Sequence, residues 1–116
     1  MSKPIPNAAQ ALVPPAKIAD YLLSDVHPIG RSKAGFIRSC GFSADHPEIL
    51  IAALKEHAGV HGAYSKPTAY GQKYIVEGEM GTPARGAVCI CAVWFIEAGA
   101  SQPIFVTAYP IKKVKP

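Results

Sequence analysis

The sequence predicts an α+β fold, with N-terminal helices packed on a C-terminal antiparallel sheet of three or four strands. Hydrophobic residues recur at helical spacing up to about Gly59, and from Gly62 onward they alternate with a period of two. The segments with period two are separated by short turns rich in glycine and proline, and strands joined in this way pair antiparallel. The 116 residues match the commonest size of a single domain, so we expect one core.

Three regions are expected along the chain. Residues 1–14 contain several prolines and lack an apolar run long enough for a secretory signal, so we predict a flexible leader there. Residues 15–110 should form the α+β domain, and residues 111–116 a basic tail. The net charge of +4 and the pI of about 9.1 favour an anionic partner such as nucleic acid over a cationic one.

Three helices are expected, over residues 16–23, 32–40 and 45–59. Ser32 is a suitable N-cap for the second helix, and Gly41 should end it. Asp45 and Glu48 have the spacing of a capping box at the start of the third helix. His57 lies in the last turn of that helix, where a structural role is expected for it.

Strands are expected over residues 70–79, 87–96 and 104–109, with a weaker one over residues 63–66. Residues 87–96 are apolar at both odd and even positions, which is typical of a central strand covered on both faces. In the last strand, simple alternation puts Thr107 and Tyr109 on the same face as Phe105. Their hydroxyl groups are expected to line a cleft beside the sheet, although both residue types are also common in strands for structural reasons.

The segment from His27 to Ala34 is the most informative motif. Gly30 permits a turn, Ser32 can cap the following helix, and the free amide groups of the first helical turn can bind an anion together with Arg31 and His27. Lys33 lies in that first turn and in line with an apolar stripe, where both the helix dipole and burial disfavour a cation. Lys33 is therefore expected either to hold a phosphate or carboxylate or to extend to solvent.

The remaining motifs exclude several classes of protein. The three cysteines are odd in number and favour a reducing, cytoplasmic compartment over a disulfide framework. The histidines and cysteines lack the spacing of a zinc site, so no metal and no cofactor is predicted. Phosphate-binding loops, dinucleotide-binding motifs and hydrolase motifs are absent from the sequence. We also expect no membrane insertion.

Taken together, several short motifs resemble a bacterial domain family of unknown function from about Lys17 to Pro110. These motifs are Lys17-x-x-x-Tyr21-Leu22-Leu23, His27-Pro28-x-Gly30-Arg31-Ser32-Lys33-Ala34-x-Phe36, Gly41-Phe42, Tyr70-Gly71-x-Lys73-Tyr74-x-Val76-x-Gly78 and Val106-Thr107-Ala108-Tyr109-Pro110. Members of that family are small proteins or C-terminal modules of large adhesin-like toxins. The layout of helices followed by a sheet is similar to that of compact ribonucleases such as barnase, colicin-type tRNases and RelE-like toxins.

The resemblance implies a metal-independent ribonuclease toxin of a toxin–antitoxin or polymorphic-toxin system, acting in the cytoplasm or delivered into that of a target cell. RNA and an antitoxin or immunity protein are the implied partners. The site residues that it suggests are His27 as general base or acid, Lys33 and Arg31 as charge stabilisers, Thr107 and Tyr109 as positioning hydroxyls, and Ser32, Lys73 and Tyr70 as substrate contacts.

Two other functions fit the same residues. The chain can act as a non-catalytic module that binds a protein partner through a basic face and an edge strand. It can also bind or convert a small anionic ligand near Gly30.

Overall fold

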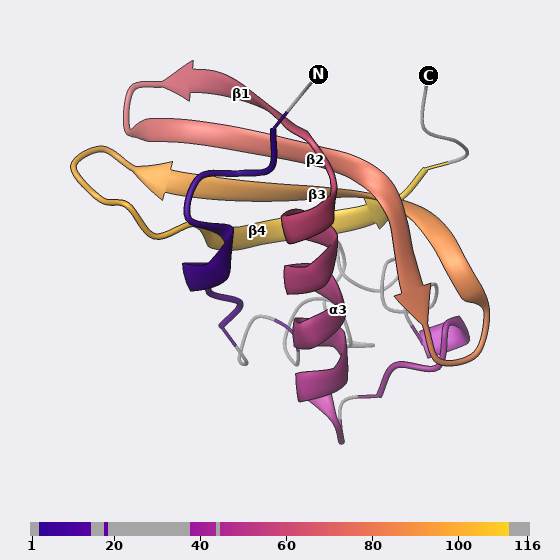
Figure 1. The fold of residues 1–116 in the computed structure, drawn as a ribbon. Coiled ribbons are helices and arrows are strands. Elements are labelled where there is room, and N and C mark those ends of the chain that lie inside the picture. The colour runs from indigo at the N-terminus through magenta and orange to yellow at the C-terminus, as the bar shows by residue number, and fades with distance from the viewer. Residues whose placement is uncertain (1–2, 15–17, 19–37, 44, 112–116) are drawn as a thin grey trace.

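The computed structural model describes residues 3–14, 18, 38–43 and 45–111. In this part of the chain, an antiparallel sheet in the order β1-β2-β3-β4 packs on one long helix (Figure 1). The elements are η1 (Ala8–Gln10), α3 (Pro47–Val60), β1 (Ala63–Thr68), β2 (Gly71–Thr82), β3 (Gly86–Glu97) and β4 (Ile104–Pro110). The predicted α+β class and all of the predicted strands, including the weaker one, are confirmed.

Helix α3 corresponds to the third predicted helix, but it begins differently. His46 is the N-cap and makes no side-chain capping bond, so the capping box predicted from Asp45 and Glu48 does not form. Pro47 occupies the first turn, where its fixed φ favours the helix and its missing N–H costs nothing. The first predicted helix and most of the second lie outside the described residues. Arg38 and Ser39 are helical, and Gly41 follows with φ 97°.

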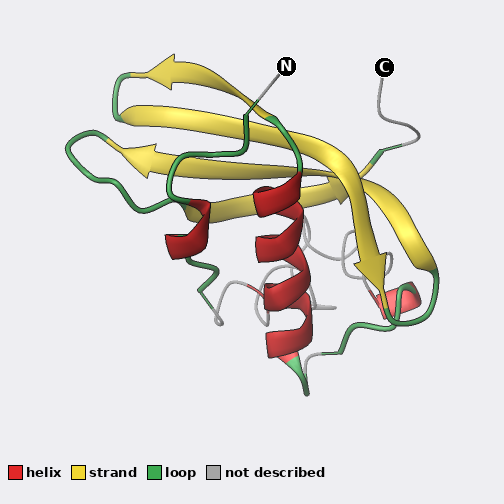
Figure 2. Ribbon diagram, in the orientation of Figure 1, coloured by secondary structure: helices red, strands yellow, loops and turns green. Residues whose placement is uncertain are grey.

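The hydrophobic core lies between α3 and the face of the sheet that we call the inner face. Helix α3 buries Leu50, Leu54 and Ala58 there, and β3 contributes Trp94 from the centre of the sheet. The rings of Trp94 and Phe105 meet edge to face, with centroids 5.4 Å apart. Such an aromatic contact stabilises a fold by about 0.5–1.5 kcal/mol beyond the area it buries. Figure 2 shows the helix lying across the curved sheet.

The N-terminal segment packs against this core. Ile5, Ala11 and Val13 are buried, and Leu12 forms a parallel bridge with Ile104 at the start of β4. The amide of Ala63 also donates a hydrogen bond to the carbonyl of Lys3 at the start of β1. Residues 3–14 are thus held by apolar burial and backbone hydrogen bonds, which differs from the flexible leader expected from their prolines.

A β-bulge in β4 changes which side chains share a face. Thr107 lies opposite Val93, whereas Phe105 lies opposite Trp94, so Val106 is an extra residue between two paired positions. Phe105 consequently points into the core, and Thr107 and Tyr109 point to the opposite face, which we call the outer face. The prediction that these three residues share a face was wrong because simple alternation does not hold across a bulge.

Among the described residues, no helix is long and apolar enough to cross a membrane.

Candidate functional site

The structure divides the predicted site residues into two groups. His27, Arg31, Ser32 and Lys33 lie outside the described residues, so the predicted anion pocket stays a prediction. The other four are described, and they lie in or beside the sheet: Tyr70, Lys73, Thr107 and Tyr109.

Lys73, Thr107 and Tyr109 lie on the outer face. Lys73 is paired with Phe95, Thr107 with Val93 and Tyr109 with Cys91. The partners alternate with Ala92 and Trp94, which are part of the core, so they point away from α3. Tyr70 is 78% exposed and lies in the turn that precedes β2.

Four side chains form a continuous polar row across the outer face, one from each strand. The Tyr64 hydroxyl of β1 donates a hydrogen bond of 3.2 Å to Oε1 of Glu77 in β2. Glu77 is paired with Cys91 of β3, and Cys91 is hydrogen-bonded to the hydroxyl of Tyr109 in β4. We call Tyr64, Glu77, Cys91 and Tyr109 the cross-strand cluster. The two tyrosines at its ends are 48% and 41% exposed, so solvent and ligands can reach both ends of the row, whereas Cys91 within it is buried.

The electrostatics of the cluster keep its hydroxyl groups protonated. The hydrogen bond to Cys91, with burial second, raises the pKa of Tyr109 to about 12. Burial raises the pKa of Tyr64, and the charge of Glu77 adds to the effect. Burial also raises the pKa of the Cys91 thiol, while the charge of Lys73 lowers it. At neutral pH the row therefore holds two protonated phenols, of which Tyr64 donates to the Glu77 carboxylate, and a neutral thiol.

Glu77, Tyr64 and Cys91 were not predicted from the sequence as members of this site. Glu77 and the apolar Ile75 are two residues apart in β2 and therefore share a face of the sheet. A charged residue beside an apolar one on that face was the only signal in the sequence that the sheet holds a carboxylate. The contacts of Glu77 depend on the register of β1 and β3 relative to β2. That register is not encoded in the residues of β2 alone.

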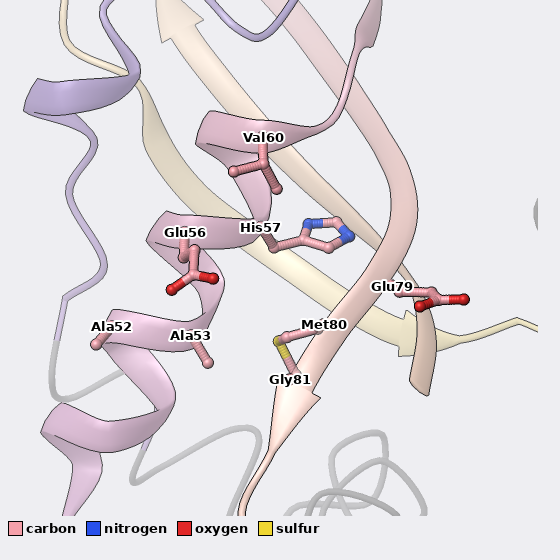
Figure 3. Close-up of a pocket in the computed structure, with 8 residues that line it drawn as sticks. All are labelled: Ala52, Ala53, Glu56, His57, Val60, Glu79, Met80 and Gly81. Carbon is pink, nitrogen blue, oxygen red and sulfur yellow. The ribbon is translucent and has the colours of Figure 1, made fainter. Parts of the chain in front are cut away.

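A second feature lies between α3 and β2. A cavity of about 240 Å³ is lined there by His57 and seven other residues, shown in Figure 3. His57 is 1% exposed, and its Nε2 lies 3.2 Å from the carbonyl oxygen of Gly78, to which it donates. Burial, and then the charge of His61, lower the pKa of His57 to about 4. The ring is therefore neutral, and its contacts join the helix to the sheet.

Glu56, His57 and Glu79 line this cavity, but no hydrogen bond or ion pair joins any two of these three side chains. Figure 3 shows the carboxylate of Glu79 pointing away from α3, on the outer side of β2. Within the described ranges, no three His, Cys, Asp or Glu side chains come close enough together to hold a metal ion. The cross-strand cluster is thus the stronger candidate site.

One chain of a solved structure, a contact-dependent growth inhibition toxin–immunity protein complex from Klebsiella pneumoniae 342, superimposes with a TM-score of 0.69. The match covers 91% of this chain and 97% of that one at 20% sequence identity, a level at which the likeness concerns the fold. No curated protein matches the sequence. A family model matches residues 4–112, and the chain therefore belongs to the family described as "Domain of unknown function (DUF6883)".

Proposed function

We propose that the chain is the toxin module of a toxin–antitoxin or polymorphic-toxin system and that it cleaves RNA without a metal ion. The observation that carries the proposal is the cross-strand cluster, which holds a carboxylate between tyrosine hydroxyls on an accessible face of the sheet. Lys73 lies close enough for its charge to act on Cys91 at the centre of the row. A carboxylate, a cation and O–H donors are groups that can act in phosphodiester cleavage as general base, charge stabiliser and hydrogen-bond donors.

The proposed reaction uses the nucleophile that RNA itself carries. Glu77 accepts the proton of a 2′-hydroxyl, the 2′-oxygen attacks the adjacent phosphorus, and the bond from phosphorus to the 5′-oxygen breaks. An acid protonates the departing 5′-oxygen, so the products are a 2′,3′-cyclic phosphate and a 5′-hydroxyl. His27 is proposed as that acid. Lys73, together with Lys33 and Arg31, is proposed to stabilise the negative charge that develops on the phosphate.

Hydroxyl groups complete the proposed site. Tyr109 stays protonated at neutral pH, since its pKa is raised to about 12, and it can therefore donate to a phosphate oxygen. Thr107 is two residues away on the same face of β4 and is proposed to position the same phosphate. Ser32 is proposed to contribute a further substrate contact.

The fold supports a toxin role by analogy, because a chain of a toxin–immunity complex has the same architecture. We propose that an immunity protein or antitoxin blocks the outer face in the producing cell, and that the toxin acts in the cytoplasm of a target cell, where RNA is available. The net charge of +4 is favourable for an RNA substrate.

The proposal is tested by expressing the chain in a host that lacks any partner. We expect growth arrest with loss of RNA, and purified protein should cleave RNA in EDTA to give 2′,3′-cyclic phosphate ends. Glu77→Gln should lower the cleavage rate about a hundredfold or more, as the loss of a proton-transfer group does. Glu79→Gln is the matched control, because Glu79 is an exposed carboxylate two residues further along the same strand. Cleavage by Glu77→Gln at the parental rate would contradict the assignment.

A non-catalytic binding module is the second candidate. It is favoured by the same structural likeness, since a toxin–immunity complex contains two proteins and only one of them is the toxin. In this case the chain would accumulate harmlessly in the host, and Glu77→Gln and the parent would behave alike.

A further inference from the structure

The outer face carries an apolar groove at the end of the sheet away from Tyr109. This apolar groove has a volume of about 440 Å³, and the residues that line it are Tyr70, Phe95, Glu97, Ile104, Phe105 and Val106. Three of its large side chains are exposed to solvent: Tyr70 at 78%, Ile104 at 40% and Val106 at 36%. A concentration of exposed apolar and aromatic surface in one hollow is a mark of a binding site.

The bulge in β4 builds one wall of this groove. The extra residue, Val106, lets Ile104 pair with Phe95 on the outer face while Thr107 occupies the same face further along the strand. A regular strand would turn one of these two side chains into the core. The bulge therefore joins the apolar groove to the candidate catalytic residues on one continuous surface.

The distance between the cross-strand cluster and the apolar groove suits a short strand of nucleic acid. Phe95 follows Cys91 by four residues in β3, which is about 13 Å at 3.3 Å per residue. A single RNA strand a few nucleotides long spans such a distance. When its phosphate lies at the cross-strand cluster, a neighbouring base reaches the apolar groove.

Two lysines lie beside the groove and supply the positive charge that the phosphates of a nucleic acid need. Lys73 is paired with Phe95, and Lys66 of β1 is paired with Lys73, so the pair lies beside the groove on the outer face. Both side chains are exposed. Proteins that bind single strands combine cations that follow the phosphates with aromatic side chains on which the bases stack. This arrangement distinguishes a nucleic-acid ligand from an apolar segment of a partner protein, which would gain nothing from the lysine pair.

We infer that the apolar groove is a base-binding subsite for single-stranded RNA, with one base stacked on Tyr70 and Phe95 and the adjoining phosphates on Lys66 and Lys73. The inference rests on the proposed function and adds where the substrate binds. Glu97 lines the groove and has only acceptor oxygens when ionised. It favours bases that carry an exocyclic amino group, so an adenine or cytosine strand should bind more tightly than a uracil strand.

The test measures binding separately from cleavage. Fluorescence anisotropy with a labelled 2′-O-methyl oligoadenylate reports affinity for a strand that the proposed reaction cannot cut. Tyr70→Ala should weaken binding about fivefold or more, since stacking on one aromatic side chain contributes about 1–3 kcal/mol per base. Tyr70→Phe keeps the ring and should bind like the parent. Val60→Ala is the control for loss of exposed apolar surface, because Val60 is 65% exposed and belongs to α3.

Two further variants test the proposed contacts to phosphate and to the base. Lys66→Ala should reduce the slope of log affinity against log salt by about 0.7, the value for one phosphate contact on a single strand. Glu97→Gln should reduce the preference for oligoadenylate over oligouridylate. Because Tyr70 and Lys66 are exposed, these substitutions should leave the fold intact, which circular dichroism checks.

The outcomes separate the subsite from the catalytic proposal. Parental oligonucleotide affinity in Tyr70→Ala overturns the subsite, even if the parent cleaves RNA. The same result combined with loss of binding to a captured protein partner assigns the groove to that partner and also overturns the subsite. Binding that depends on Tyr70 in a protein that cleaves no RNA supports the subsite and contradicts the proposed function.

Discussion

Tyr109 and Cys91 lie directly opposite each other on β4 and β3, and their side chains are hydrogen-bonded on the outer face of the sheet. The bond raises the pKa of Tyr109 and burial raises that of Cys91, so both groups are protonated at neutral pH. The thiol is fully buried, whereas the tyrosine is 41% exposed. This bond fixes the orientation of a hydroxyl group that can still reach a ligand.

Tyr109→Phe should lower RNA cleavage by about tenfold to a hundredfold, because it removes a positioned O–H donor while keeping the ring. Initial rates with a short labelled RNA measure the effect. Tyr74→Phe is the control, since Tyr74 lies in β2 and packs against the core on the inner face. Equal rates for Tyr109→Phe and the parent would remove Tyr109 from the proposed site.

His27→Ala and Lys33→Ala should each lower the cleavage rate by about a hundredfold or more, as the loss of a proton-transfer group or a charge stabiliser typically does. EDTA should have no effect, because the proposed reaction uses no metal. Single-turnover rates with and without EDTA provide the measurement. Parental rates in both variants, together with inhibition by EDTA, would contradict the metal-independent mechanism.

His57→Ala separates a structural role from a catalytic one. The ring is buried and donates to Gly78 on the face of the sheet opposite the cross-strand cluster, so we expect the rate of the folded protein to stay near the parental value. Its thermal midpoint should fall, because the change leaves a cavity and an unpaired carbonyl and costs about 2–4 kcal/mol. A large loss of rate in fully folded His57→Ala would bring His57 into the mechanism.

The strands could be predicted from the sequence because their signals are local. Period-two alternation and turn residues mark β2, β3 and β4, and the apolar run in β3 marks it as central. The end of the second predicted helix near Gly41 was also predictable, because a positive φ of 97° suits glycine. The start of α3 was not predicted correctly, because Pro47 occupies the first turn and makes His46 the N-cap in place of Asp45.

The site depended on information that local patterns do not carry. Tyr64 and Glu77 meet only because β1 and β2 pair in one particular register. Thr107 and Phe105 lie on opposite faces because of a bulge that neither residue type predicts. The sequence therefore identified Thr107, Tyr109 and Lys73 as candidates, but not the carboxylate that lies among them.

Gly71→Ala should destabilise the protein by about 2 kcal/mol or more. Gly71 has φ 154° at the first position of β2, and a Cβ there would overlap the carbonyl oxygen of Ile96 in β3. Gly59→Ala in α3 is the matched control, because a Cβ at Gly59 meets nothing within 4 Å. That change should stabilise the helix by about 0.5–1 kcal/mol. Urea denaturation of both variants measures the two effects, and equal stability of Gly71→Ala and the parent would contradict the strained turn.

The buried His57 should make stability depend on pH between about 4 and 6.5. Its pKa is lowered to about 4 in the folded state, first by burial and then by the charge of His61, against an ordinary value of 6.5. Below pH 6.5 the unfolded chain binds a proton that the folded protein does not yet take up. The stability contributed by neutral His57 is therefore complete above pH 6.5, and it is lost as the pH falls toward 4. The full difference is about 3 kcal/mol.

Urea denaturation of the parent and of His57→Gln at pH 7.5 and pH 4.5 isolates this contribution, because carboxylates titrate alike in both proteins. The parent should lose about 2–3 kcal/mol more than the variant between the two pH values. His46→Gln is the control for replacing an exposed histidine, since the His46 side chain is 65% exposed. An NMR titration of the His57 ring in the parent gives the pKa directly if His57→Gln fails to fold. A ring that titrates near 6.5, or equal losses in the parent and His57→Gln, would show that α3 does not bury His57 against β2 in solution.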